Sequence, residues 1–230
     1  MKREMKITFV FALVSILCVC NIQAEIIWDS GHHIFSEGSE DYVYMYNDAS
    51  AEIVGGEIDW MYMYNEAFAD ITGGQIWELY MYNSTTADIS GGYVSILLGQ
   101  DTSSVDVYAG SDIGLLRPND SSTANVYGGT INHLFVLGNS TTNIYEGDFT
   151  MGFSANDSPV INMYVQEYHW DPDGGSSSGF GLLTGTWLNS GEAFSIDYVD
   201  LDSFDHIAFV PEPSTMLLVG LGGLVLRTKK

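Results

Sequence analysis

The sequence has very few positively charged residues. Seven lysines and arginines stand against thirty aspartates and glutamates, which gives a formal net charge of −23. Arg117 is the only one of these cations between Glu25 and Val210. A body this acidic repels phosphate backbones, so its charge argues against nucleic acid as a partner. Anionic polysaccharides are repelled as well, unless divalent cations bridge the two.

Cysteine is nearly absent too. Cys18 and Cys20 are the only two, and both lie in an apolar run near the N-terminus. If that run is removed, the rest of the chain has no thiol, no disulfide and no cysteine metal site. The acidity does not indicate disorder, because 46% of the residues are hydrophobic and 13% are aromatic. We therefore expect a body that is stabilised by packing and backbone pairing.

The N-terminal segment has the pattern of an export signal. Residues 1–6 are basic, residues 7–20 are almost wholly apolar, and Ala24 provides a small residue before Glu25. The apolar run is too short for a comfortable membrane span. Residues 1–24 are therefore predicted to be a signal peptide that is removed on secretion.

The C-terminal segment has three parts in a fixed order. Pro211, Glu212 and Pro213 come first, an apolar stretch follows over residues 216–226, and the chain ends in a basic tetrapeptide. This order closely resembles a PEP-CTERM sorting signal. The resemblance implies recognition and processing by an exosortase-type membrane protease in an exopolysaccharide-producing bacterium. We expect residues 211–230 to be a sorting tail that contacts the membrane transiently and attaches the protein there before processing.

The middle of the chain is repetitive. The motif Tyr-Met-Tyr-Asn occurs at residues 44–47, 62–65 and 80–83, and a Gly-Gly pair occurs at 55–56, 73–74 and 91–92. Both therefore recur at a constant period of eighteen positions. The period continues after the motifs decay, because one aliphatic column keeps it with at most one extra residue in a unit: Ile53, Ile71, Ile89, Val107, Val126, Ile144 and Met163.

This period is too short for the common helical repeats. The units are rich in β-formers that alternate with polar residues, and glycines punctuate them. The sequence therefore predicts an all-β fold, a parallel β-solenoid of about eight coils over residues 25–166, with a small β cap over residues 167–210. The handedness rule for parallel crossovers favours a right-handed coil.

Alternation along the predicted strands assigns their faces. Ala51 and Ile53 point inward with their equivalents. A second inward column is predicted at the same period: Met61, Leu79, Leu97, Leu115 and Leu134.

One outward row is acidic. It consists of Glu52, Asp70, Asp88 and Asp106, which precede the core aliphatic residues. Stacked carboxylates repel one another unless a cation bridges them, and Ca²⁺ prefers carboxylate oxygen. The row is a candidate Ca²⁺ site. The alternative is a solvated face that needs no cofactor.

Two outward rows are aromatic. The first contains Tyr44, Tyr62 and Tyr80, and the second contains Tyr46, Tyr64 and Tyr82. Flat rows of rings can bind sugars, which makes these residues candidates for carbohydrate adhesion. The alternative is stacking between coils that stabilises the solenoid.

No catalytic motif accompanies these rows. The sequence has no nucleophile elbow, no zinc-binding histidine–glutamate motif and no phosphate-binding glycine loop. Some β-helices are polysaccharide lyases, but such enzymes need cations to hold acidic sugars, and Arg117 stands alone. The leading hypothesis is a non-catalytic structural or adhesive protein of the bacterial surface or exopolysaccharide matrix. The alternatives are a carbohydrate- or Ca²⁺-binding module and a polysaccharide-active enzyme.

Overall fold

The computed structural model describes residues 25–177 and 179–211. The predicted signal peptide lies outside these residues. So do Glu212, Pro213 and the rest of the predicted tail. Within the described part of the chain, no helix is long and apolar enough to cross a membrane.

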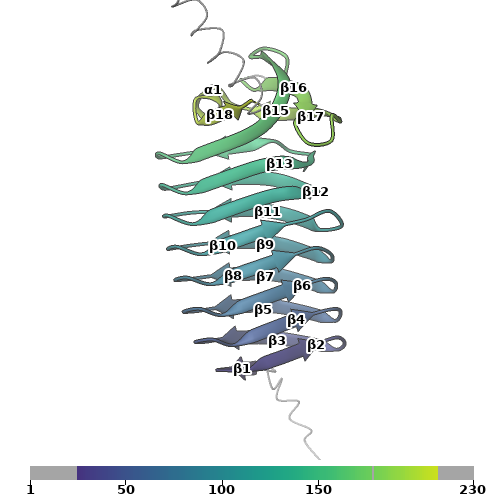
Figure 1. Ribbon diagram of the computed structural model, residues 1–230, viewed down its shortest axis with the longest axis vertical. Coiled ribbons are helices and arrows are strands. Elements are labelled where there is room, and N and C mark those ends of the chain that lie inside the picture. The colour runs from purple at the N-terminus through teal and green to yellow at the C-terminus, as the bar shows by residue number, and fades with distance from the viewer. Residues whose placement is uncertain (1–24, 178, 212–230) are drawn as a thin grey trace, which may run out of the picture.

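Each coil contributes one short strand and one longer strand, and the two kinds form separate parallel layers (Figure 1). The short-strand layer contains β2 (His32–Phe35), β4 (Ser50–Ile53), β6 (Phe68–Ile71), β8 (Thr86–Ile89), β10 (Ser104–Val107) and the first parts of β12 (Thr123–Val136), β13 (Thr141–Phe149) and β15 (Val160–Asp171). The long-strand layer contains β1 (Glu25–Trp28), β3 (Ser39–Met45), β5 (Glu57–Met63), β7 (Gln75–Met81), β9 (Tyr93–Gly99), β11 (Asp112–Pro118), the second part of β12, and β14 (Phe153–Ala155).

The strands pair in parallel with their equivalents in the next coil. Ile53 is the register partner of Ile71, and Ile71 of Ile89, so the repeat period of the sequence is also the hydrogen-bonding register. Parallel strands lie about 4.8 Å apart, which gives eight coils a length of roughly 40 Å. The predicted all-β parallel solenoid is confirmed.

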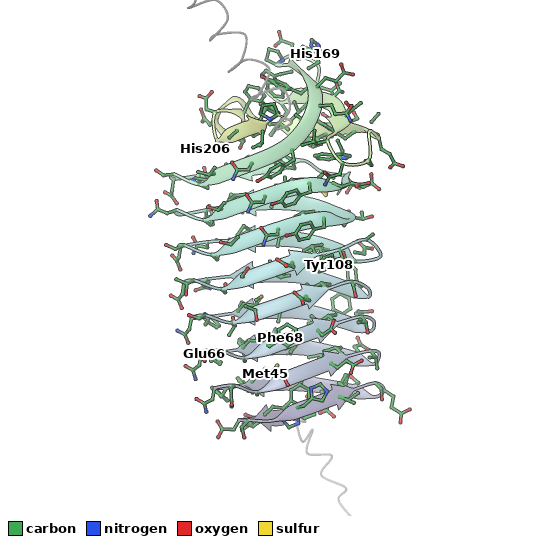
Figure 2. All side chains as sticks on the ribbon, in the orientation of Figure 1. Met45, Glu66, Phe68, Tyr108, His169 and His206 are labelled. Atoms are coloured by element: carbon green, nitrogen blue, oxygen red, sulfur yellow. The ribbon has the colours of Figure 1, made fainter. Side chains whose placement is uncertain are left out.

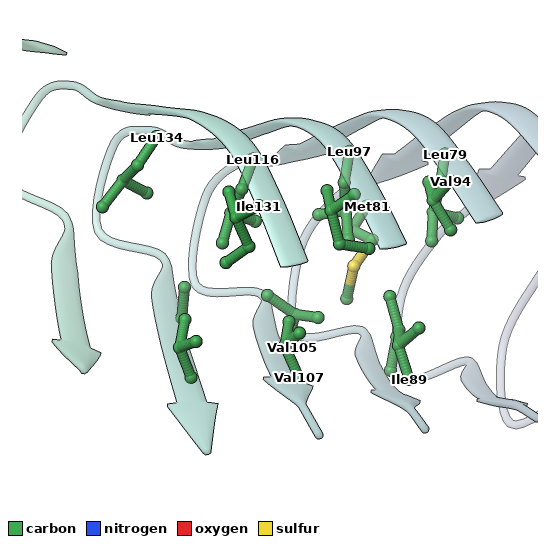
Figure 3. Close-up of a cluster of buried hydrophobic side chains, with 14 of the residues drawn as sticks. Leu79, Met81, Ile89, Val94, Leu97, Val105, Val107, Leu116, Ile131 and Leu134 are labelled. Carbon is green, nitrogen blue, oxygen red and sulfur yellow. The ribbon is translucent and has the colours of Figure 1, made fainter. Parts of the chain in front are cut away.

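The core is a set of stacked apolar columns. Ala51, Ile53 and Met61 are each at most 1% exposed, and the equivalents in the next coils are buried as well. Burying one large aliphatic side chain is worth about 1.5–3 kcal/mol, so the repeated columns are the main source of stability. Figure 3 shows the second inward column as a row that contains Leu79, Leu97, Leu116 and Leu134.

One member of that column differs from the prediction. Leu116, not Leu115, is the register partner of Leu97 and Leu134, and Leu116 is fully buried while Leu115 is only partly covered. The turn between Val107 and Asp112 contains one extra residue. It shifts the next strand by one position, and a shift of one residue exchanges the two faces of a strand.

Two kinds of turn let the strands repeat. One is an asparagine or aspartate with positive φ, as at Asn65, where φ is 63°. The other is the Gly-Gly corner. A Cβ atom on Gly73 would lie 2.5 Å from the carbonyl oxygen of Val54 in the preceding coil, so only glycine fits.

The C-terminal end of the solenoid is covered by further strands. β15 continues past the solenoid and pairs antiparallel with β16 (Gly181–Trp187), which pairs antiparallel with β17 (Ala193–Val199). A short helix, α1 (Leu201–Phe204), then leads to β18 (Ile207–Val210). β18 returns to the solenoid and pairs parallel with β15. The segment after the repeats therefore contributes a last strand to the short-strand layer.

Buried hydroxyl groups provide a test of this packing. Ser103 occupies the inward position that Ala49 and Ala67 hold in earlier coils, is 1% exposed, and has no hydrogen-bond partner for its Oγ atom. We expect Ser103→Ala to raise the free energy of unfolding by about 1 kcal/mol, because a buried unpaired hydroxyl is costly. Urea denaturation measures the change.

Ser122 is the matched control. It holds the same position in the next coil, but its Oγ accepts a hydrogen bond from the Asn119 backbone N–H at 2.9 Å. Ser122→Ala should destabilise the protein by a similar amount. Equal destabilisation by both substitutions would contradict the packing described for this column.

Candidate functional site

The tyrosine rows predicted from the sequence form one continuous surface. The rings of Tyr44, Tyr62 and Tyr80 stack at centroid distances of 5.1 and 5.0 Å. The neighbouring row has the same spacings, and Tyr42 stacks on Trp60 at 5.0 Å. We call this surface the aromatic face; it consists of Tyr42, Tyr44, Tyr46, Trp60, Tyr62, Tyr64, Tyr80 and Tyr82.

Register explains why the rings meet. Tyr44, Tyr62 and Tyr80 are direct partners on β3, β5 and β7, so each ring lies over its equivalent. The rows lie side by side on the outer surface, with Tyr44 and Tyr46 6.3 Å apart between centroids. Three successive coils thus contribute to the aromatic face.

The stacking limits which parts of the rings are available. The side chains of the aromatic face are half-buried rather than fully exposed, because each ring covers a face of the next. What remains outward is ring edges and phenol hydroxyls. Tyr80 donates a short hydrogen bond to Glu78, which raises the pKa of Tyr80 well above its usual value, and burial raises it further. The phenol of Tyr80 therefore stays protonated and uncharged at any physiological pH.

The acidic row is also in register. Glu52, Asp70, Asp88 and Asp106 are successive partners on β4, β6, β8 and β10. Partial burial raises the pKa of Asp88, and the charges of Asp106 and Asp70 raise it further. In residues 25–177 and 179–211, no group of three or more His, Cys, Asp or Glu side chains is arranged to hold a metal ion. Ca²⁺ binding by this row stays a prediction.

Amides continue the acidic row toward the C-terminus. Asn125 donates to the Asp106 carboxylate at 2.7 Å, Asn143 donates to the Asn125 carbonyl at 2.8 Å, and Asn162 donates to the Asn143 carbonyl at 2.8 Å. An amide both donates and accepts, so Asn125 and Asn143 each hydrogen-bond to the coil on either side. The carboxylates of the acidic row, when ionised, can accept hydrogen bonds but cannot donate them.

A third tyrosine row lies beside these amides. Tyr108, Tyr127, Tyr145 and Tyr164 stack at 5.2, 4.8 and 4.2 Å between centroids. Figure 2 shows the start of this row at Tyr108, on the outer side of the solenoid. Hydrogen bonding with Tyr164, together with burial, raises the pKa of Tyr145 to about 12. The candidate site residues did not include this row, although the sequence places a tyrosine after each of four core aliphatic residues.

The histidines make separate contacts. His32 hydrogen-bonds Ser50 at 3.1 Å, while the ring of His33 stacks on Trp28. His133 bonds Ser154, and burial lowers its pKa. At the cap, His169 lines an open hollow of about 600 Å³ with Glu167 and residues of β16 and β17. None of these contacts joins one histidine to another.

Replacement of one acid by its amide tests the electrostatics of the acidic row. We expect Asp88→Asn to raise the free energy of unfolding at pH 7 by up to about 1 kcal/mol, because it removes a charge that directly faces like charges. The folded-state pKa of Asp88 is raised, so the stabilising contribution of this group is complete below about pH 4 and is lost as the pH rises through the raised pKa. The gain should therefore disappear in acid.

Urea denaturation at pH 3 and pH 7 measures this difference. Asp112→Asn is the control, since Asp112 is exposed and stands outside the row, and it should change stability little at either pH. A loss of stability in Asp88→Asn at pH 7 would mean that the carboxylate is held by favourable contacts instead.

Comparisons with known proteins identify one segment. Residues 209–230 match the PEP-CTERM protein-sorting motif. No curated protein and no solved structure matches the chain. The motif implies a secreted surface protein that an exosortase sorts and processes. The resemblance inferred from Pro211, Glu212 and Pro213 is thereby confirmed.

Proposed function

We propose that this exosortase-sorted protein is a non-catalytic structural and adhesive component of the bacterial surface or exopolysaccharide matrix. The observation that carries the proposal is the unbroken series of in-register rows along the solenoid. Rings stack on rings and amides bond to amides from one coil to the next. Such rows stiffen a rod, because bending it would pull apart the stacked groups on its convex side.

The polar side chains of the rows hydrogen-bond to one another. The carbonyl of Asn125 is taken by Asn143, and that of Asn143 by Asn162. In the turns, the side chain of Asn65 donates to Asn47 at 3.1 Å, and that of Asn47 donates to Asp29 at 2.7 Å. Groups bonded in this way support the coils rather than bind a ligand. Hydrogen bonding between coils fits the role of a rigid spacer.

The aromatic face supplies the adhesive part of the proposal. It is flat, it covers three successive coils, and its ring edges and hydroxyls point outward. The phenol of Tyr80 is uncharged, whereas the body around it is strongly acidic. This combination favours a neutral polysaccharide, whose hydroxyls can hydrogen-bond the phenols and whose C–H groups can pack on ring edges. An acidic glycan would be repelled.

Binding to polysaccharides tests the adhesive role. The purified protein should sediment with a neutral insoluble glucan. Trp60→Ala should weaken binding about tenfold, because a central aromatic contact in an interface is worth about 1–2 kcal/mol. Tyr127→Ala, in the third tyrosine row, is the control and should bind like the parent protein. Tyr62→Phe retains the stacked ring, so a loss of binding there would assign the contact to the phenol hydroxyl.

The same mixtures test the non-catalytic role. The protein should release no new reducing ends from neutral or acidic polysaccharides on prolonged incubation. Turnover that a single carboxylate substitution abolished would contradict the proposal and favour a polysaccharide-active enzyme. Equal binding by Trp60→Ala, Tyr127→Ala and the parent protein would exclude the aromatic face as the adhesive surface.

A further inference from the structure

The sorting motif begins inside the folded body. The matched segment starts at residue 209, whereas β18 runs from Ile207 to Val210. Phe209 and Val210 therefore belong both to the motif and to the last strand of the solenoid. Pro211 follows β18 directly, with no linker between the strand and the proline–glutamate–proline sequence. The structure thus fixes the position from which the motif leaves the body.

β18 is paired along one edge only. Its register partner is β15, with Ile161 opposite Ile207 and Met163 opposite Phe209. The N–H of Ile161 donates to the carbonyl of His206 at 2.9 Å. In a parallel ladder, alternate residues of one strand direct their N–H and C=O groups to the partner. His206 and Ala208 therefore face β15, while Ile207 and Phe209 direct their backbone groups to the other edge. No other described strand pairs there.

Aromatic contacts fix the paired strand in place. The ring of Phe209 stacks on Tyr168 at 3.6 Å between centroids, and Phe204 lies 5.9 Å from Phe209. Phe204 stacks in turn on Trp170 of β15 at 4.4 Å. These contacts join β18 and α1 to the long extension of β15. Side-chain packing therefore adds to the backbone hydrogen bonds that hold β18 in place.

We infer that the free edge of β18 is a docking surface for the exosortase-type protease, which binds it by adding a strand while β18 stays paired with β15. Three observations favour this partner. The motif that the protease reads is continuous with β18, the outward backbone groups of Ile207 and Phe209 have no strand beside them, and the stack on Tyr168 retains β18 in its extended form. Strand addition to an exposed edge is a recurrent mode of peptide recognition.

A reversible lock tests whether β18 stays paired. Asn162 and Ala208 are partners on neighbouring strands, and the distance of about 4.8 Å between such Cα atoms suits a disulfide. The full chain with Asn162→Cys and Ala208→Cys is expressed in cells that contain the protease, and processing is followed by pulse-chase as a decrease in mass. We expect the oxidised lock to be processed at the parent rate. Processing of the reduced form alone would overturn the inference, because it would show that β18 must detach.

A second pair of variants tests the edge itself. Ile207→Pro removes the N–H group that faces the free edge, and proline is tolerated in an edge strand where its nitrogen faces solvent. Ile207→Ala is the matched control, because it trims the side chain and keeps the N–H. We expect Ile207→Pro to be processed about tenfold more slowly than Ile207→Ala, from the loss of one hydrogen bond. Equal rates for the two variants would overturn the proposed strand addition.

Discussion

The structure depends on parallel hydrogen bonding between coils in a fixed register. Each strand of a coil obtains its backbone partners from the coils before and after it, and the partner of a residue is the equivalent residue of the neighbouring repeat. Every side chain therefore lies over its equivalent. The inward side chains form continuous apolar columns, and the outward side chains form rows of the same residue type. Gly73 shows how strict this is, because the carbonyl of Val54 occupies the space that any side chain there would need.

Stacking places like side chains next to one another, so the attraction or repulsion between two such residues is repeated along the row. Stacking is favourable for tyrosine, since the ring of Tyr62 contacts a ring on each side. It is favourable for asparagine because Asn143 both donates and accepts hydrogen bonds along the row. Stacking is unfavourable for aspartate, since Asp88 lies between two other carboxylates, and burial together with their charges raises its pKa. The chain uses each type over only part of the solenoid, and the acidic row gives way to amides after Asp106. The arrangement gives the described part of the solenoid a regular outer face.

Much of this was predictable because the period is visible in the sequence. The spacing of Ile53, Ile71 and Ile89 predicted both the fold and the stacking of the tyrosines. The exchange of Leu115 for Leu116 was not predictable from the column alone, since one extra turn residue leaves an apolar residue at both positions. The pairing of β18 with β15 joins segments that the whole cap separates along the chain, and it follows no repeat. The sequence named the aromatic rows and the acidic row as candidates, but the hydrogen bonds that join Asn125 to Asp106 depend on side-chain placement that only the structure provides.

Coil deletion tests the central claim, that the register between equivalent residues of neighbouring coils holds the rod together. Removal of residues 68–85 joins Ala67 to Thr86 and eliminates β6 and β7, so that Ala87 takes the place of Ala69 opposite Ala51. The account predicts a cooperative thermal transition for this variant and, by small-angle scattering, a rod shorter by about 4.8 Å. Removal of residues 68–76 takes out only half a coil, so later strands no longer meet their equivalents in the preceding coil, and it should abolish the cooperative transition. Similar behaviour of the two deletions, or loss of folding in the first, would contradict the account.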